Sequence, residues 1–258
     1  MKLQKYQQRF ANATDFTFTF VGNIDLKEME ELVTTYIASL PSSDKQSPEQ
    51  KLHVGKHNKG HIEVHLKNGL DQKAFVLLEN SGETTWSNKN KILFEMVKST
   101  LNVLLRNKIR EQLGGTYNIS VKGKLNNQPE QEYILSTQFF CEPERVDELV
   151  NAVQNELQRI KLEGINQKLL DNFKKQQSIA RKHMLSNNKY WLYKLSKLDE
   201  ESMFDLNNKL YNKTLAEITV AQVNQAMNAY LNSTNSVYAT LLPENSPVLL
   251  ATKLKQTK

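Results

Sequence analysis

Apolar and polar residues alternate over short stretches of this chain and recur at three- and four-residue steps over longer ones. Alternation is typical of strands, and the longer period is typical of helices. Residues 16–20 place three phenylalanines at alternate positions and end near Gly22, which predicts a first strand. Asp25, with Glu28 three residues later, forms a capping-box pattern that predicts a helix ending at Pro41.

The same patterns predict further strands and helices along the rest of the chain. Five more strands are expected over residues 61–66, 73–80, 116–125, 132–140 and 236–243. Asn68-Gly69 is a turn signal between the first two of them. Amphipathic helices are expected over residues 87–113, where Gly114-Gly115 ends the helix, and over 143–163, where Gly164 ends it. A third helix should begin after a cap at Asn166. A fourth should run from a Thr219/Gln222 capping box to about Leu231.

The order of these elements is one strand and one helix, two strands, a helix, two strands, several helices and a closing strand. Short connections between neighbouring strands favour antiparallel pairing. We therefore predict an α+β fold, with a mostly antiparallel sheet and helices packed on one face. The 258 residues contain no interior linker, which favours one domain.

The positive charge of the chain lies at its two ends. Lys and Arg number 34 against 28 Asp and Glu, giving a formal net charge of +6. Six of the basic residues lie within residues 1–10 and 248–258, where there are no acids, so residues 11–247 carry 28 of each sign. A nucleic-acid-binding domain would show basic excess in its body, so we expect no nucleic-acid partner. No apolar run reaches the ~18 residues of a membrane helix, so we expect no membrane insertion.

Four of the five histidines are spaced four residues apart, at His53, His57, His61 and His65. In a strand, His61 and His65 share one face with Glu63, which leaves a metal site geometrically open. The alternative, which is more common, is a solvated strand face. The order H-x-E-x-H also differs from the metallopeptidase motifs H-E-x-x-H and H-x-x-E-H. We therefore predict no metal site in this chain.

The single cysteine, Cys141, excludes an internal disulfide and any multi-cysteine metal site. It lies between a predicted strand and a predicted helix. A thiol near a helix N-terminus can have a lowered pKa, whereas a packed thiol is inert. The second interpretation is the more common one.

The stretch from Arg110 to Tyr117 holds the most informative chemistry. Arg110 lies in the last turn of a predicted helix, Tyr117 opens the next strand, and Gly114-Gly115 allows a tight reversal between them. Both side chains should therefore meet at one helix–strand corner. A guanidinium and a phenol there could bind a peptide or stabilise negative charge on a carbonyl oxygen. Alternatively, the arginine interacts with the helix dipole and the tyrosine only favours a strand.

Arg110-Glu111 followed by Leu113-Gly114-Gly115-Thr116-Tyr117 resembles the R-E-x-x-G-x-x-Y signature of the pitrilysin/insulysin family of zinc metallopeptidases. The resemblance covers most of the chain. Residues 16–41 resemble the strand–Gly–Asp–helix pattern of this family. Three more blocks, at 140–146, 188–192 and 241–244, resemble its bacterial PqqL-like subgroup.

This resemblance implies a peptidase built from homologous α+β domains in two halves, with the zinc motif H-x-x-E-H in the first half. It implies that Arg110 and Tyr117 bind peptide or unfolded-protein substrate near a zinc ion held by the other half. The chain itself has no H-x-x-E-H, so alone it should be inactive and hold no cofactor.

The resemblance also implies a place for this chain in a longer protein. Residues 1–14 would be a linker or the end of a preceding domain, 15–247 the C-terminal domain, and 248–258 a basic tail. The N-terminal zinc-bearing half would be its partner, and the periplasm its compartment. The alternative is a scaffold domain of the same fold in a parent that has lost proteolysis.

Overall fold

The computed structural model describes residues 12–43, 59–69, 71–197, 203, 206–232 and 234–248. Most of the two predicted terminal segments, together with His53 and His57, lies outside these residues. The chain divides into two units. One comprises residues 1–53 and 178–211, and the other comprises residues 54–177 and 212–258.

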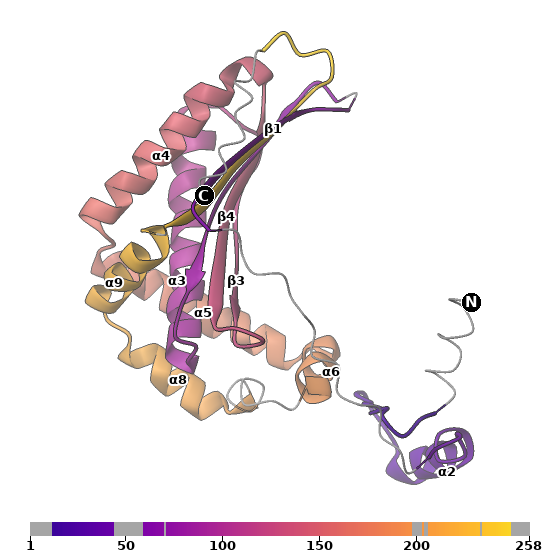
Figure 1. Ribbon diagram of the computed structural model, residues 1–258. Helices are drawn as coiled ribbons and strands as arrows, with labels where there is room; N and C mark the ends of the chain where they lie inside the picture. Colours follow the sequence, from indigo (N-terminus) through magenta and orange to yellow (C-terminus); the bar gives the residue numbers. More distant parts are fainter. Residues whose placement is uncertain are drawn as a thin grey trace. The chain divides into compact units, whose positions relative to one another are not determined.

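The second unit is built on a five-stranded sheet (Figure 1). Its strands are β1 (His61–Lys67), β2 (Ala74–Glu83), β3 (Ile119–Asn126), β4 (Glu132–Cys141) and β5 (Asn235–Leu242). The order across the sheet is β1-β5-β2-β4-β3, and all pairs are antiparallel except β1 with β5. The predicted α+β class with a mostly antiparallel sheet is therefore confirmed.

The position of β5 corrects the expected pairing of the first two strands of this sheet. The Asn68-Gly69 turn signal suggested a hairpin, but β5 lies between β1 and β2. It pairs Val237 with Ile62 on one side and with Glu79 on the other. β5 pairs with β1 residues 175 positions away, and it occupies this place because it supplies hydrogen-bond partners to both β1 and β2.

Helices cover one face of the sheet (Figure 1). They are α3 (Asn88–Leu105), α4 (Val146–Glu163) and α9 (Val220–Leu231). Two further helices follow α4 in the chain, α5 (Gln167–Leu185) and α8 (Asn208–Glu217). Predicted caps are in place: the Asn166 side chain accepts a hydrogen bond from the Leu169 amide, and Thr219 with Gln222 forms a full capping box. Ser87 caps α3.

The core between sheet and helices contains three interlocked aromatic rings. Phe94 of α3 packs edge-on against Tyr230 of α9, with centroids 4.9 Å apart, and Tyr133 of β4 contacts both. Gly123 of β3 makes this packing possible, since a Cβ there would lie 2.7 Å from the Phe94 ring. These rings anchor α3 to the sheet ahead of its C-terminal end.

The end of the first long helix differs from the prediction. The sequence predicts one amphipathic helix over 87–113, whereas the α-helix ends at Leu105 and continues as a π-helix, η1 (Arg106–Gln112). The wider turn buries Ile109 completely while Arg110 remains exposed. π-Helical turns are rare and occur frequently at functional sites.

The described part of the first unit includes α2 (Leu26–Tyr36) and α6 (Asn188–Lys197). Asp25 caps α2 by accepting hydrogen bonds from the backbone of Lys27 and Glu28. The predicted strand over residues 16–20 is wrong for this structure, where the segment is not assigned to a strand. Alternation is not sufficient for a strand, because its backbone also needs a neighbouring strand to pair with.

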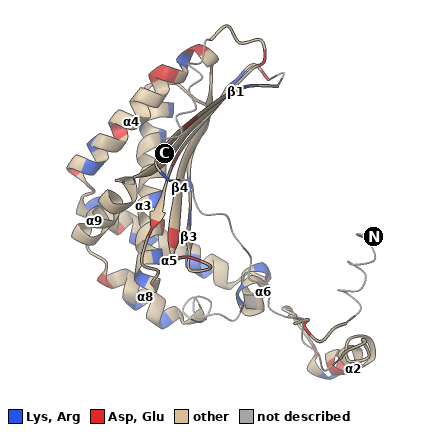
Figure 2. Ribbon diagram, in the orientation of Figure 1, with Lys and Arg blue, Asp and Glu red and all other residues tan. Residues whose placement is uncertain are grey.

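Residues 11–247 carry equal numbers of acidic and basic residues. Acidic and basic residues both occur along α4 (Figure 2). Among the described residues, no helix is long and apolar enough to cross a membrane.

Candidate functional site

The structure brings Arg110 and Tyr117 together at one corner of the second unit. Arg110 lies in the last turn of η1, and Tyr117 lies two residues before β3, rather than opening the strand. The Arg110 guanidinium carbon is 5.6 Å from the centroid of the Tyr117 ring, within the range of a cation–π contact. Six residues lie between them in the sequence, and the two side chains are adjacent in space.

Both side chains present hydrogen-bond donors to solvent. Tyr117 is 85% exposed, and within the described residues its hydroxyl has no hydrogen-bond partner. The Arg110 side chain is 44% exposed and makes one ion-pair contact, 3.5 Å from its Nε to a carboxylate oxygen of Glu111. This leaves donors of the guanidinium available. The pair can therefore bind a carbonyl or carboxylate oxygen presented from outside.

The connection between the two residues is fixed by its own backbone. The amide of Leu113 donates to the Lys108 carbonyl, and the amide of Gly115 donates to the Ile109 carbonyl at 3.0 Å. Gly114 has φ of 56°, the left-handed conformation that ends many helices and that glycine adopts without strain. The chain reverses here immediately after the π-helical turn.

The next two residues pack against the body of the domain. Gly115 is buried against Leu149 of α4, and a Cβ at this position would lie 2.2 Å from the Leu149 Cδ2 atom. The buried Thr116 hydroxyl donates to the Phe140 carbonyl at the end of β4. We call residues 113–116 the corner loop.

A residue that sequence analysis did not single out also reaches the corner loop. Arg145, in the 3-10 turn η2 (Pro143–Arg145) before α4, donates hydrogen bonds to the carbonyls of Leu113 and Gly114, each at 3.3 Å. It also forms a two-bond ion pair with Glu148. The one local signal was this charge pair at three-residue spacing, which is common on helices and is not specific for a functional site.

Two substitutions separate lack of space from backbone strain in the corner loop. Gly115→Ala should destabilise the domain by about 1–3 kcal/mol by overpacking, and Gly114→Ala by about 1–2 kcal/mol through its left-handed backbone. Chemical denaturation of each variant should be repeated with Leu149→Ala. That change makes room for a Cβ at Gly115 and should reduce the cost there, but leave the cost at Gly114 unchanged. An equal cost of Gly115→Ala in both backgrounds would contradict the packing described.

The histidines of β1 are bonded to neighbouring side chains. His61 and Glu63 share a face as predicted, 3.0 Å apart, and His61 Nδ1 lies 2.7 Å from the Ser236 hydroxyl. His65 Nδ1 lies 2.7 Å from the Thr240 hydroxyl, and its ring packs edge-on against Tyr238. No group of three or more His, Cys, Asp or Glu residues in the described part of the chain could hold a metal ion. The described residues therefore do not fit a zinc site.

Cys141 ends β4 and is buried. Burial, together with the nearby Glu142 carboxylate, raises the pKa of the thiol to about 11. Arg145 lowers it by a smaller amount. Cys141 is therefore packed, and the raised pKa favours the interpretation of an inert thiol over that of a reactive one.

Cys141 should therefore resist labelling in the native state. With a pKa of about 11, only about a thousandth of the thiol is ionised at pH 8. The disulfide reagent DTNB should react slowly with the native chain and rapidly in urea, with Cys141→Ser as the unreactive control. Native labelling should accelerate by about tenfold per pH unit above pH 8 and level off above pH 11, because the thiolate is the reacting form. Rapid native labelling at pH 8 would refute the burial.

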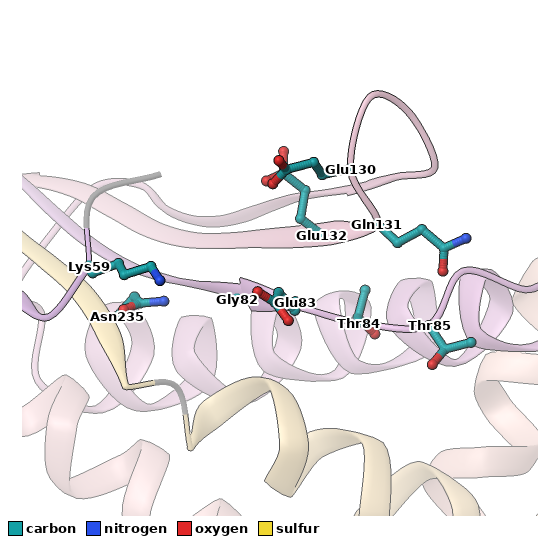
Figure 3. Close-up of a pocket in the computed structure, with 9 residues that line it drawn as sticks. All are labelled: Lys59, Gly82, Glu83, Thr84, Thr85, Glu130, Gln131, Glu132 and Asn235. Carbon is teal, nitrogen blue, oxygen red and sulfur yellow. The ribbon is translucent and has the colours of Figure 1, made fainter. Parts of the chain in front are cut away.

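A polar pocket lies at the other end of the sheet (Figure 3). Its volume is about 700 Å³, and its lining includes Lys59, Glu83, Glu130 and Glu132. β4 begins in this pocket at Glu132, and the Phe140 carbonyl near its other end meets the corner loop. Ten strand residues span about 30 Å, so the pocket is separate from the Arg110–Tyr117 pair.

The sequence of this chain is similar to that of known peptidases. Residues 2–177 match the family described as the peptidase M16 inactive domain. The chain is 24% identical over 244 residues to the probable zinc protease PqqL of Escherichia coli, a match covering 92% of this chain and 26% of that protein. It is 25% identical over 186 residues to the probable zinc protease PqqL of Haemophilus influenzae, covering 64% of this chain and 17% of that protein.

Solved structures show the same fold. The crystal structure of the periplasmic protease PqqL from Escherichia coli superposes with a TM-score of 0.69 and 21% identity, covering 86% of this chain and 24% of that one. The chain thus spans about a quarter or less of the length of these relatives.

Proposed function

Because this chain belongs to the peptidase M16 inactive-domain family, we propose that it binds substrate beside the zinc site of a longer, PqqL-like protease. In this proposal Arg110 holds a carbonyl or carboxylate oxygen of a peptide, and Tyr117 donates a hydrogen bond to the oxyanion that develops during hydrolysis. The zinc ion and its ligands would come from the other half of the protein. When bound there, zinc would activate the attacking water.

The observation that carries this proposal is the exposed, adjacent placement of Arg110 and Tyr117 on either side of the hydrogen-bonded corner loop. Two donors of this kind near a scissile bond stabilise charge that appears in the transition state. A guanidinium offers several N–H groups in a fixed plane, which suits an oxygen acceptor. Their exposure in this chain is what a site completed by another part of the protein requires.

The chain alone should not hydrolyse peptides. Its sequence has no H-x-x-E-H motif, and its described residues provide no set of metal ligands. The relatives it matches are named as probable zinc proteases and are about four times longer or more. We therefore assign zinc to the parent protein and not to this domain. One of these relatives is named as a periplasmic protease, which supports the same compartment for the parent.

Substitution of the pair in the longer protease tests the proposal. Arg110→Ala and Tyr117→Phe should each lower kcat/KM for a peptide by about 10²–10³, the scale for losing one such donor. Arg106→Ala is the matched control, because it removes an exposed cation from the same π-helix. Wild-type kinetics for both Arg110→Ala and Tyr117→Phe would refute the role.

The alternative is a scaffold domain in a parent without proteolytic activity. An N-terminal half lacking H-x-x-E-H would favour it. In that case the two substitutions would alter neither turnover nor peptide binding. The domain boundaries at residues 14 and 247 remain predictions in either case.

Exposed apolar side chains in residues 12–43 support a covering partner from the same longer polypeptide. Phe16, Phe18 and Phe20 are 40–48% exposed, and α2 has no buried residue although Leu26 and Leu32 lie on it. A helix with an apolar stripe normally packs that stripe against another element. We propose that the N-terminal half of the protease covers this segment.

Polar substitutions in this segment should behave differently in the two contexts. Phe18→Ser and Leu32→Ser should hardly change the melting temperature of the 258-residue chain, because both side chains are about half exposed there. In the longer protein each should cost about 1–3 kcal/mol, since burial of such a side chain contributes that much. Leu162→Ser, at an 87% exposed position on α4, is the control in the isolated chain. An equal loss of stability in the 258-residue chain and in the longer protein would show that the partner covering this segment is within the chain itself.

A further inference from the structure

We infer that Arg145 and Glu148 are positioning residues that hold the corner loop, and through it the relative placement of Arg110 and Tyr117. Arg145 makes four hydrogen bonds. Its Nη1 and Nη2 donate to the carbonyls of Gly114 and Leu113, and its Nε and Nη2 donate to the two carboxylate oxygens of Glu148 at 2.9 and 2.7 Å. For its effect on catalysis, the inference rests on the proposed function.

The two carbonyls need an external donor because of how η1 ends. The last carbonyls of a helix have no partner within the helix, and the chain turns away at Gly114. Arg145 comes from a different element and donates to the carbonyls of Leu113 and Gly114, the two residues that follow η1, at the helix end where a cation is favoured. The connection between η1 and β3 is thereby attached to the start of α4.

Glu148 fixes the direction in which Arg145 points. A carboxylate that accepts two parallel N–H bonds orients the guanidinium plane, so the remaining donors face the loop carbonyls. The hydrogen bond from Arg145 also lowers the pKa of the Glu148 carboxyl, which favours the charged form of that carboxylate. Neither residue contacts Arg110 or Tyr117 directly in this arrangement. Their effect is exerted through the loop backbone.

The shape of arginine is required at this position. Its planar group carries five donors and serves two carbonyls and one carboxylate at once. A lysine ammonium is a single centre on a flexible stem and cannot reproduce this geometry. Arg145→Lys should therefore fail to hold the corner loop, although it keeps the positive charge.

Arg159 offers a matched control on α4, the helix that also carries Glu148. It forms the same kind of two-bond pair with Glu156, three residues before it, and a further ion pair with Glu163. Its partners in the described structure are these helix carboxylates and not the loop. Arg159→Ala thus removes an arginine and its ion pairs from α4 without touching the corner.

Amide hydrogen exchange in the 258-residue chain tests the positioning directly. The Gly115 amide donates to the Ile109 carbonyl, so its exchange reports opening of the corner loop. Arg145→Ala and Arg145→Lys should accelerate exchange at Gly115 by about 10- to 100-fold, and Glu148→Gln by less, because losing bonds to a charged donor has this effect. Arg159→Ala should leave it unchanged. Unchanged exchange in Arg145→Ala, or equal acceleration in Arg159→Ala, would overturn the inference.

Kinetics of the longer protease test the consequence for the site. Arg145→Ala should lower kcat by roughly tenfold with a smaller change in KM, and should add little to the effect of Arg110→Ala, because both act on the same contact. Fully additive effects would overturn the positioning role. If Arg110→Ala is itself silent, the proposed function fails, whereas the exchange result still decides whether Arg145 holds the loop.

Discussion

The close approach of Gly115 to Leu149 is the contact on which the arrangement of this domain's exposed corner depends. It requires a residue without a Cβ, and it brings the end of η1, the start of β3 and α4 to one place. Thr116 then reaches the β4 carbonyl, and the carbonyls of the preceding residues face Arg145. A wider separation at this point would loosen each of these bonds. The geometry of the exposed corner therefore depends on this close packing.

The π-helical turn contributes the other half of the geometry. An ordinary α-helix advances about 100° per residue, so one extra residue in a turn rotates all later side chains relative to the buried stripe. In η1, this keeps Ile109 in the core while Arg110 is directed outward, toward the ring of Tyr117. Buried neighbours thus add to the cation–π contact between the two residues in placing the exposed pair.

Much of this fold could be predicted from local pattern, because caps and alternation are local. Asp25, Ser87, Asn166 and Thr219 all begin helices as their side chains suggest. The pairing of β1 with β5 could not be predicted, since it joins residues about 175 positions apart. The π-turn was also missed. The one sequence signal for it is the four-residue spacing of Leu101, Leu105, Ile109 and Leu113. In an α-helix, residues spaced by four lie about 40° apart around the axis, so this run does not stay on one face. Arg145 was missed because its targets are backbone carbonyls, which have no sequence signature.

The position of β5 between β1 and β2 sets an order of events during synthesis. Residues 61–67 leave the ribosome well before the strand that lies beside them, residues 235–242. Until then β2 has only its other neighbour, β4, and β1 has no neighbour in this sheet. A sheet completed by such distant pairing folds slowly and exposes strand edges meanwhile. The nascent domain must therefore spend most of its translation as an unfinished sheet, a state in which chaperones have time to act.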